Sequence, residues 1–87
     1  MPTETEVLEF FNSCVRSEKG NRVTINSSLR DADLDSFGIT TLLLDLDERY
    51  GYFNNIPDDE DPFSSIPYDT ITVKEIIDTC ISTSTTT

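Results

Sequence analysis

Residues 36–50 carry apolar side chains at the spacing of an α-helix, between an aspartate that can cap a helix and a glycine that can end one. With an advance of about 100° per residue, five side chains gather on one face. They are Ile39, Leu42, Leu43, Leu46 and Tyr50. Asp35 is a favourable N-cap and Gly51 a favourable stop. The segment therefore predicts a helix from Ser36 to about Tyr50 that packs against a core.

The opposite face of this helix also carries apolar side chains. Phe37 and Leu44 fall there, and Thr40 and Thr41 lie between them. A surface helix needs one apolar stripe for its core, so a second stripe opposite the first indicates a surface on which a partner docks. The alternative is that Phe37 folds back onto the preceding loop and that Leu44 is a scattered surface residue.

Two further segments repeat apolar residues at helical spacing, one near each end of the chain. Thr3 and Glu6 form a capping box before the first, Gly20 is expected to stop it, and Thr72 and Glu75 form a capping box before the last. The apolar stripes are Val7, Leu8, Phe11, Cys14 and Val15 in the first segment and Val73, Ile76, Ile77, Cys80 and Ile81 in the last. The chain after Ile81 is almost pure Ser and Thr, so residues 1–82 are predicted to form the domain and residues 83–87 a disordered tail.

The connecting segments show no helical period. Between about Lys19 and Leu34, three residues are spaced as apolar anchors, namely Val23, Ile25 and Leu29, which predicts an ordered crossover. Three prolines interrupt residues 52–70, where Phe63 and Ile66 allow one short helical turn. Because 87 residues support one small core, the sequence predicts an all-α four-helix bundle of three longer helices and a short third helix, with a long first loop.

The charge is strongly unbalanced, with six Lys or Arg against seventeen Asp or Glu and a net charge of -11. Such a surface repels nucleic acids and anionic membranes, and it attracts proteins with basic patches. The alternative is that the acidity only keeps a small protein soluble.

The cysteines and the absence of targeting signals indicate a reducing environment. Cys14 and Cys80 each lie in an apolar run, and the chain has no His. Buried thiols are therefore favoured over a disulfide or a reactive cysteine. No signal peptide or long apolar span is visible, so a cytoplasmic monomer is expected.

This organisation resembles the acyl carrier protein family. The similarity centres on Leu34-Asp35-Ser36-Phe37, which looks like the family's Asp-Ser-Leu motif, and it extends to Ile56-Pro57 and to the Thr72-Val73 start of the last helix. The resemblance implies that a separate magnesium-dependent phosphopantetheinyl transferase attaches 4′-phosphopantetheine from coenzyme A to Ser36. Asp35 and Phe37 would support the attachment motif.

By the same resemblance, the chain is a carrier without catalytic residues, whose arm holds acyl groups as thioesters. The implied partners are acyl-transferring or condensing enzymes with basic patches. The implied partner-binding residues are Phe37, Thr40, Thr41, Leu44, Asp45, Asp47 and Glu48. The chain departs from the family at Phe37, where Leu is usual, at Asp33, where Gly is frequent, and at Gly38 and Thr41, where many fatty-acid carriers have acidic residues. Fatty-acid synthesis, polyketide synthesis and a specialised acyl-transfer pathway all remain open.

Three other functions compete with this expectation. Asp31, Asp33 and Asp35 alternate as in a calcium loop, but Ser36 and Leu42 occupy the positions that need Gly and Glu. An acidic interaction protein without a prosthetic group, such as a nucleic-acid mimic or inhibitor, fits the charge but leaves the apolar outer face unexplained. An enzyme is disfavoured because the chain lacks His, a Gly-rich phosphate loop and a nucleophile paired with a base.

Overall fold

Three α-helices form the framework of the computed structural model, which describes residues 2–57, 59–61, 64 and 66–84. They are α1 (Glu4–Ser17), α2 (Ser36–Tyr50) and α4 (Val73–Ser84), and two short 3₁₀ helices, η1 (Leu29–Ala32) and η2 (Tyr52–Asn55), lie between them. The described residues contain no β-strand, only an isolated bridge between Ser28 and Thr72. The prediction of an all-helical protein is confirmed.

The helix starts follow the predicted capping boxes. The Glu6 N–H donates to Thr3 Oγ1 at 3.1 Å, and the Glu75 N–H donates to Thr72 Oγ1 at 3.2 Å. At the end of α2, Gly51 adopts the left-handed conformation with a φ of 72°, which glycine reaches without steric cost. The predicted bounds of α2 are therefore confirmed.

The end of α1 differs from the prediction, because Lys19 and not Gly20 takes the left-handed conformation, with a φ of 62°. The Lys19 N–H donates to the Arg16 carbonyl at 2.9 Å and the Gly20 N–H to the Val15 carbonyl at 2.8 Å, which is the Schellman pattern. Glycine is needed at position 20 because the neighbouring atoms leave no room for a side chain. A Cβ at this position would lie 2.5 Å from Leu34 Cδ2 and 2.7 Å from the Ala32 carbonyl oxygen.

The core lies where the three helices meet, and each helix contacts the other two. The largest fully buried side chains are Phe11, Leu29, Leu42, Leu43, Leu46, Ile76 and Ile77. Phe10 and Phe53 pack at its edge. The radius of gyration is 11.9 Å, close to the value of about 12 Å expected for a folded domain of this length.

The crossover between α1 and α2 is ordered, as predicted. Val23 and Leu29 are buried in the core, and Ile25 packs against it. The Leu29 N–H donates to the Ile71 carbonyl at 3.0 Å, and the Val73 N–H donates to the Ser27 carbonyl at 2.9 Å. These bonds join the crossover to the start of α4.

The four-helix prediction is only partly met, since the described residues contain three α-helices. Of the two residues expected to form the short third helix, Ile66 is buried and Phe63 lies outside the described residues. Between α2 and α4 the described residues contain η2, which begins directly at the Gly51 turn, and Ser64, which is helical where the short third helix was expected. The sequence did not predict η2, because the short helix was expected at Phe63 and Ile66, where apolar residues have helical spacing.

The predicted tail also begins too early. α4 continues to Ser84, and Thr83 is buried because its hydroxyl donates to the Tyr50 carbonyl at 2.9 Å. Residues 85–87 of the predicted tail lie outside the described residues. Cys14 and Cys80 are both buried and free.

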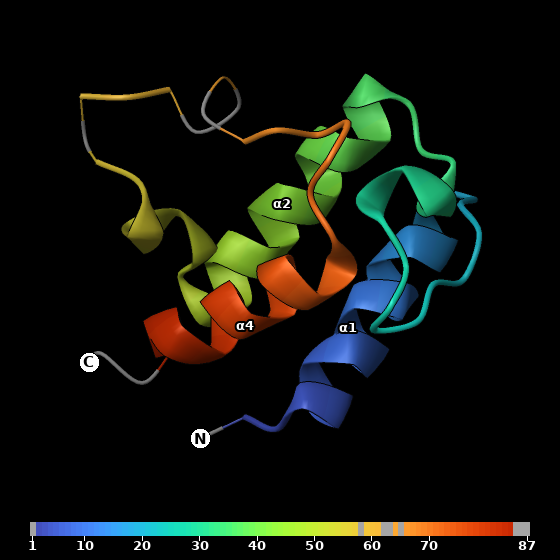
Figure 1. The fold of residues 1–87 in the computed structure, drawn as a ribbon, viewed down its shortest axis with the longest axis horizontal. Coiled ribbons are helices and arrows are strands. Elements are labelled where there is room, and N and C mark those ends of the chain that lie inside the picture. Colours follow the sequence, from blue (N-terminus) through green and yellow to red (C-terminus); the bar gives the residue numbers. More distant parts are fainter. Residues whose placement is uncertain (1, 58, 62–63, 65, 85–87) are drawn as a thin grey trace.

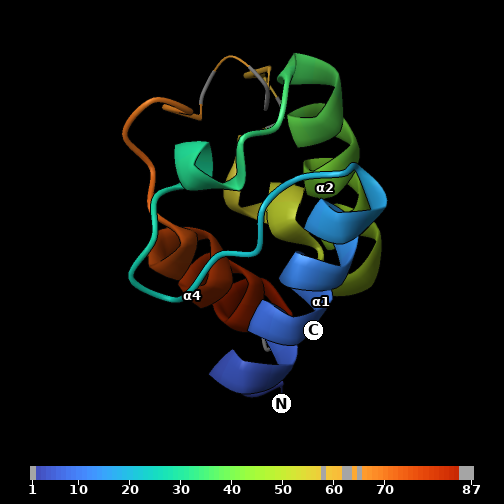
Figure 2. The same cartoon turned by 90° about the vertical axis from the view of Figure 1, so that its right-hand side faces the viewer.

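The start of α2 lies at the opposite end of the molecule from the start of α1 and the end of α4. Figure 1 shows the beginning of the green α2 at the top, above the start of the blue α1 and the end of the red α4, and the turned view in Figure 2 agrees. No helix of the described residues is long and apolar enough to cross a membrane.

Candidate functional site

Asp35 and Ser36 form the first turn of α2. Asp35 is the N-cap, and its Oδ1 accepts a hydrogen bond from the Gly38 N–H at 2.7 Å. Ser36 is the first helical residue and is exposed. Its hydroxyl makes no hydrogen bond with the described residues. Asp35 therefore holds the turn, while the Ser36 hydroxyl is accessible for reaction.

The loop before this turn is held by close packing around Leu34. Leu34 is half buried, and a Cβ at Gly38 would lie 3.4 Å from its Cβ and 3.2 Å from Asp35 Oδ1. Gly20 lies against the same side chain. Asp33, one residue earlier, has a φ of 56°. The sequence analysis did not predict the packing of Gly20 and Gly38 around Leu34, although these two glycines were a signal for it.

Phe37 and Leu44 lie on the outer face of α2, as predicted. Their side chains are 73% and 48% exposed, and they are the exposed large hydrophobic residues of the described chain. The alternative in which Phe37 folds back onto the loop is therefore wrong. Thr40 and Thr41 lie between them, half buried, and their hydroxyls donate to the Ser36 and Phe37 carbonyls at 2.8 and 3.1 Å.

The three acidic residues expected at this face lie in different surroundings. Glu48 is exposed one turn beyond Leu44. Asp47 is half buried, and its Oδ1 accepts the Phe53 N–H at 2.8 Å, so it holds η2. Asp45 is half buried beside Cys14, where burial and then the Asp45 charge raise the pKa of the thiol to about 11. The outer face of α2 therefore presents Phe37, Leu44 and Glu48, whereas Asp45 and Asp47 also make contacts within the fold.

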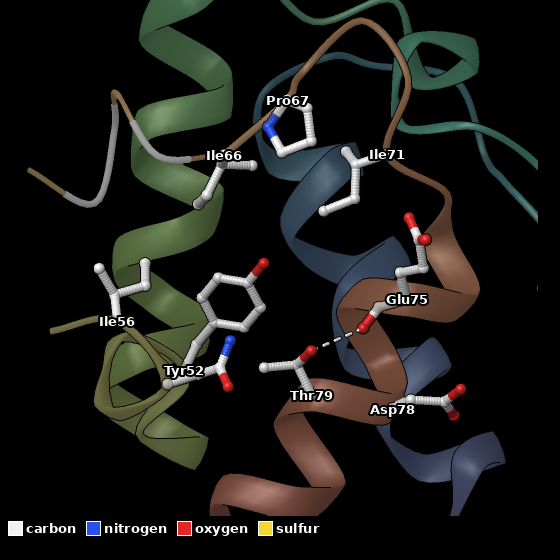
Figure 3. Close-up of a pocket in the computed structure, with 9 residues that line it drawn as sticks. Tyr52, Ile56, Ile66, Pro67, Ile71, Glu75, Asp78 and Thr79 are labelled. Atoms are coloured by element: carbon white, nitrogen blue, oxygen red, sulfur yellow. Dashed lines mark hydrogen bonds between the residues drawn. The ribbon is translucent and has the colours of Figure 1, made fainter.

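A pocket of about 480 Å³ opens between η2, α4 and the chain before α4. Figure 3 shows the Tyr52 ring pointing into it, with three isoleucines around the ring and α4 along one side. The lining residues are Tyr52, Asn55, Ile56, Ile66, Pro67, Ile71, Glu75, Asp78 and Thr79. The sequence reasoning did not find this pocket, because three segments that are separate in sequence form it.

The described residues contain no group of three or more His, Cys, Asp or Glu side chains that could hold a metal ion, and this includes the three aspartates of the calcium alternative. No protein-family model, no curated protein and no solved structure matches the chain.

Proposed function

We propose that this chain is an acyl carrier protein, with 4′-phosphopantetheine from coenzyme A attached to Ser36 and acyl intermediates held on the arm as thioesters. The observation that carries the proposal is the exposed Ser36 hydroxyl, which makes no hydrogen bond with the described residues, directly between the capping Asp35 and the exposed Phe37. A serine in this position needs no rearrangement of the helix to be modified.

The first turn of α2 suits a phosphodiester. The first N–H groups of a helix have no partner within it, and the helix dipole places partial positive charge at this end. A phosphate attached at Ser36 would lie beside both. The Asp35 carboxylate already accepts the Gly38 N–H, but residues 36–39 include no acidic residue. The Ser36 and Phe37 N–H groups make no hydrogen bond with a carboxylate of the described residues.

The outer face of α2 supports a role in partner binding. Phe37 adjoins the attachment site, Leu44 lies two turns away, and Glu48 lies beyond it. Contact with the two apolar side chains would supply affinity. The acidic surroundings would accelerate the encounter with enzymes that carry basic patches. The long ordered crossover and the three packed helices also fit a bundle of the acyl-carrier type.

Intact-mass measurement with a broad-specificity phosphopantetheinyl transferase, magnesium and coenzyme A tests the attachment. The chain should gain the mass of one arm, and Ser36→Ala should gain none. Ser13→Ala is the matched control, because Ser13 is also an exposed helical serine, and it should be modified fully. A chain left unmodified by several transferases, or an arm retained in Ser36→Ala, would refute the proposal. The first result would favour the acidic interaction protein without a prosthetic group.

A negative charge introduced on the outer face tests partner binding. Phe37→Glu and Leu44→Glu should each reduce modification by the transferase, while the helical circular dichroism stays unchanged and stability changes by about 0.5 kcal/mol or less. Thr5→Glu places the same charge on the exposed surface of α1 and should leave modification unchanged. Equal loss in all three variants would show a general charge effect and argue against a specific face.

A further inference from the structure

The pocket beside Tyr52 has the shape and walls of a small-molecule site. Its volume of about 480 Å³ lies within the range of about 300–1,000 Å³ typical of ligand sites. Ile66, Ile71 and Tyr52 are less than a tenth exposed, so the pocket reaches below the surface. Its inner wall is therefore apolar and suits an alkyl or aromatic group.

The carboxylates that line the pocket make its rim negative. Asp78 is paired, since its Oδ2 lies 3.3 Å from Lys74 Nζ, and Figure 3 shows it pointing away from Tyr52. Glu75 makes no ion pair with the described residues. One of its oxygens accepts the Thr72 N–H at 3.0 Å, and the second accepts no hydrogen bond from the described residues. Glu75 is therefore the carboxylate that can receive a ligand.

The Tyr52 hydroxyl adds no negative charge to the pocket at physiological pH. Burial, followed by the nearby ionisable groups including Glu75, raises its pKa to about 12. The ring is therefore a neutral aromatic wall at physiological pH.

We infer that this pocket binds a small amphiphile that consists of an apolar chain ending in an amine. The alkyl chain packs against Ile56, Ile66 and Ile71 beside the Tyr52 ring, and the ammonium group lies at the rim near Glu75, whose carboxylate points toward the start of α4 in Figure 3. An alkyl chain that ends in a carboxylate or phosphate would contact the same apolar wall, but the carboxylate at the rim would repel its charged end. The inference does not depend on an arm at Ser36, and the unmodified chain suffices to test it.

An NMR titration of the unmodified chain at neutral pH with n-octylammonium and, separately, n-octanoate provides the test. The two probes have the same alkyl chain and opposite charges. Octylammonium should give saturable shifts at Tyr52, Ile66, Ile71 and Thr79, and octanoate should bind at least about tenfold more weakly. Absence of saturable octylammonium binding, or equal binding of the two probes, would overturn the inference.

Two Glu→Gln variants distinguish the effect of the rim carboxylate from the effect of the overall charge. Glu75→Gln removes the rim carboxylate but keeps a residue that completes a capping box. Glu6→Gln is the matched control, because Glu6 occupies the same position in the capping box of α1. The preference for octylammonium over octanoate should fall about fivefold in Glu75→Gln and less than twofold in Glu6→Gln. Equal falls in both variants would show that net charge and not the pocket selects the amine.

Discussion

Lys19 ends α1 in a backbone conformation that favours glycine. Its φ is 62°, and a side chain in the left-handed region costs roughly 1–2 kcal/mol. Both Schellman hydrogen bonds involve backbone atoms, so they survive replacement of the side chain. Lys19→Gly should therefore raise the free energy of unfolding by about 1 kcal/mol in urea denaturation.

The control for this prediction is Lys19→Ala, which removes the same charge but keeps a Cβ. It should give no comparable gain. An equal gain in both variants would contradict the prediction, because Lys19→Ala keeps the Cβ and because loss of a positive charge from a chain of net charge -11 should not raise stability.

At the scale of the elements, Asn12 joins α1 to the crossover. Its Nδ2 donates to the Val23 carbonyl at 2.9 Å, and its Oδ1 accepts the Val23 N–H at 2.8 Å. Asn12→Ala leaves both groups without their partner, which costs roughly 1–3 kcal/mol for partly buried polar groups. Urea denaturation should show this loss, and hydrogen exchange at the Val23 amide should accelerate. Asn26→Ala, at an exposed site, should change stability by about 0.5 kcal/mol or less.

The elements also show how far the sequence predicts the structure. The helices were predictable because their capping boxes, their apolar stripes and Gly51 are local signals. The end of α4 was not, because Thr83 is buried through a bond to Tyr50, 33 residues away. The same distinction applies to the site. Asp35, Ser36 and the outer face follow from one helix, whereas the pocket and the local roles of Asp45 and Asp47 depend on tertiary contacts.

At the scale of the whole molecule, the buried thiols link stability to alkaline pH. Burial raises the pKa of Cys80 from about 9 to about 12, and burial and then Asp45 raise that of Cys14 to about 11. A pKa raised by folding means that the native state favours the protonated thiol. The resulting stability is complete below about pH 9 and is lost as the pH rises through the folded-state values.

Urea denaturation between neutral pH and about pH 11 should therefore show a falling free energy of unfolding above about pH 9. Cys80→Ala lowers stability at every pH because it leaves a cavity, so the informative quantity is the slope with pH. That slope should be shallower in Cys80→Ala, since one group no longer releases a proton on unfolding. Measurement in high salt reduces the contribution of growing negative charge repulsion. An unchanged slope in that solvent would mean that Cys80 does not contribute, and the alkaline loss would then belong to Cys14 and the tyrosines.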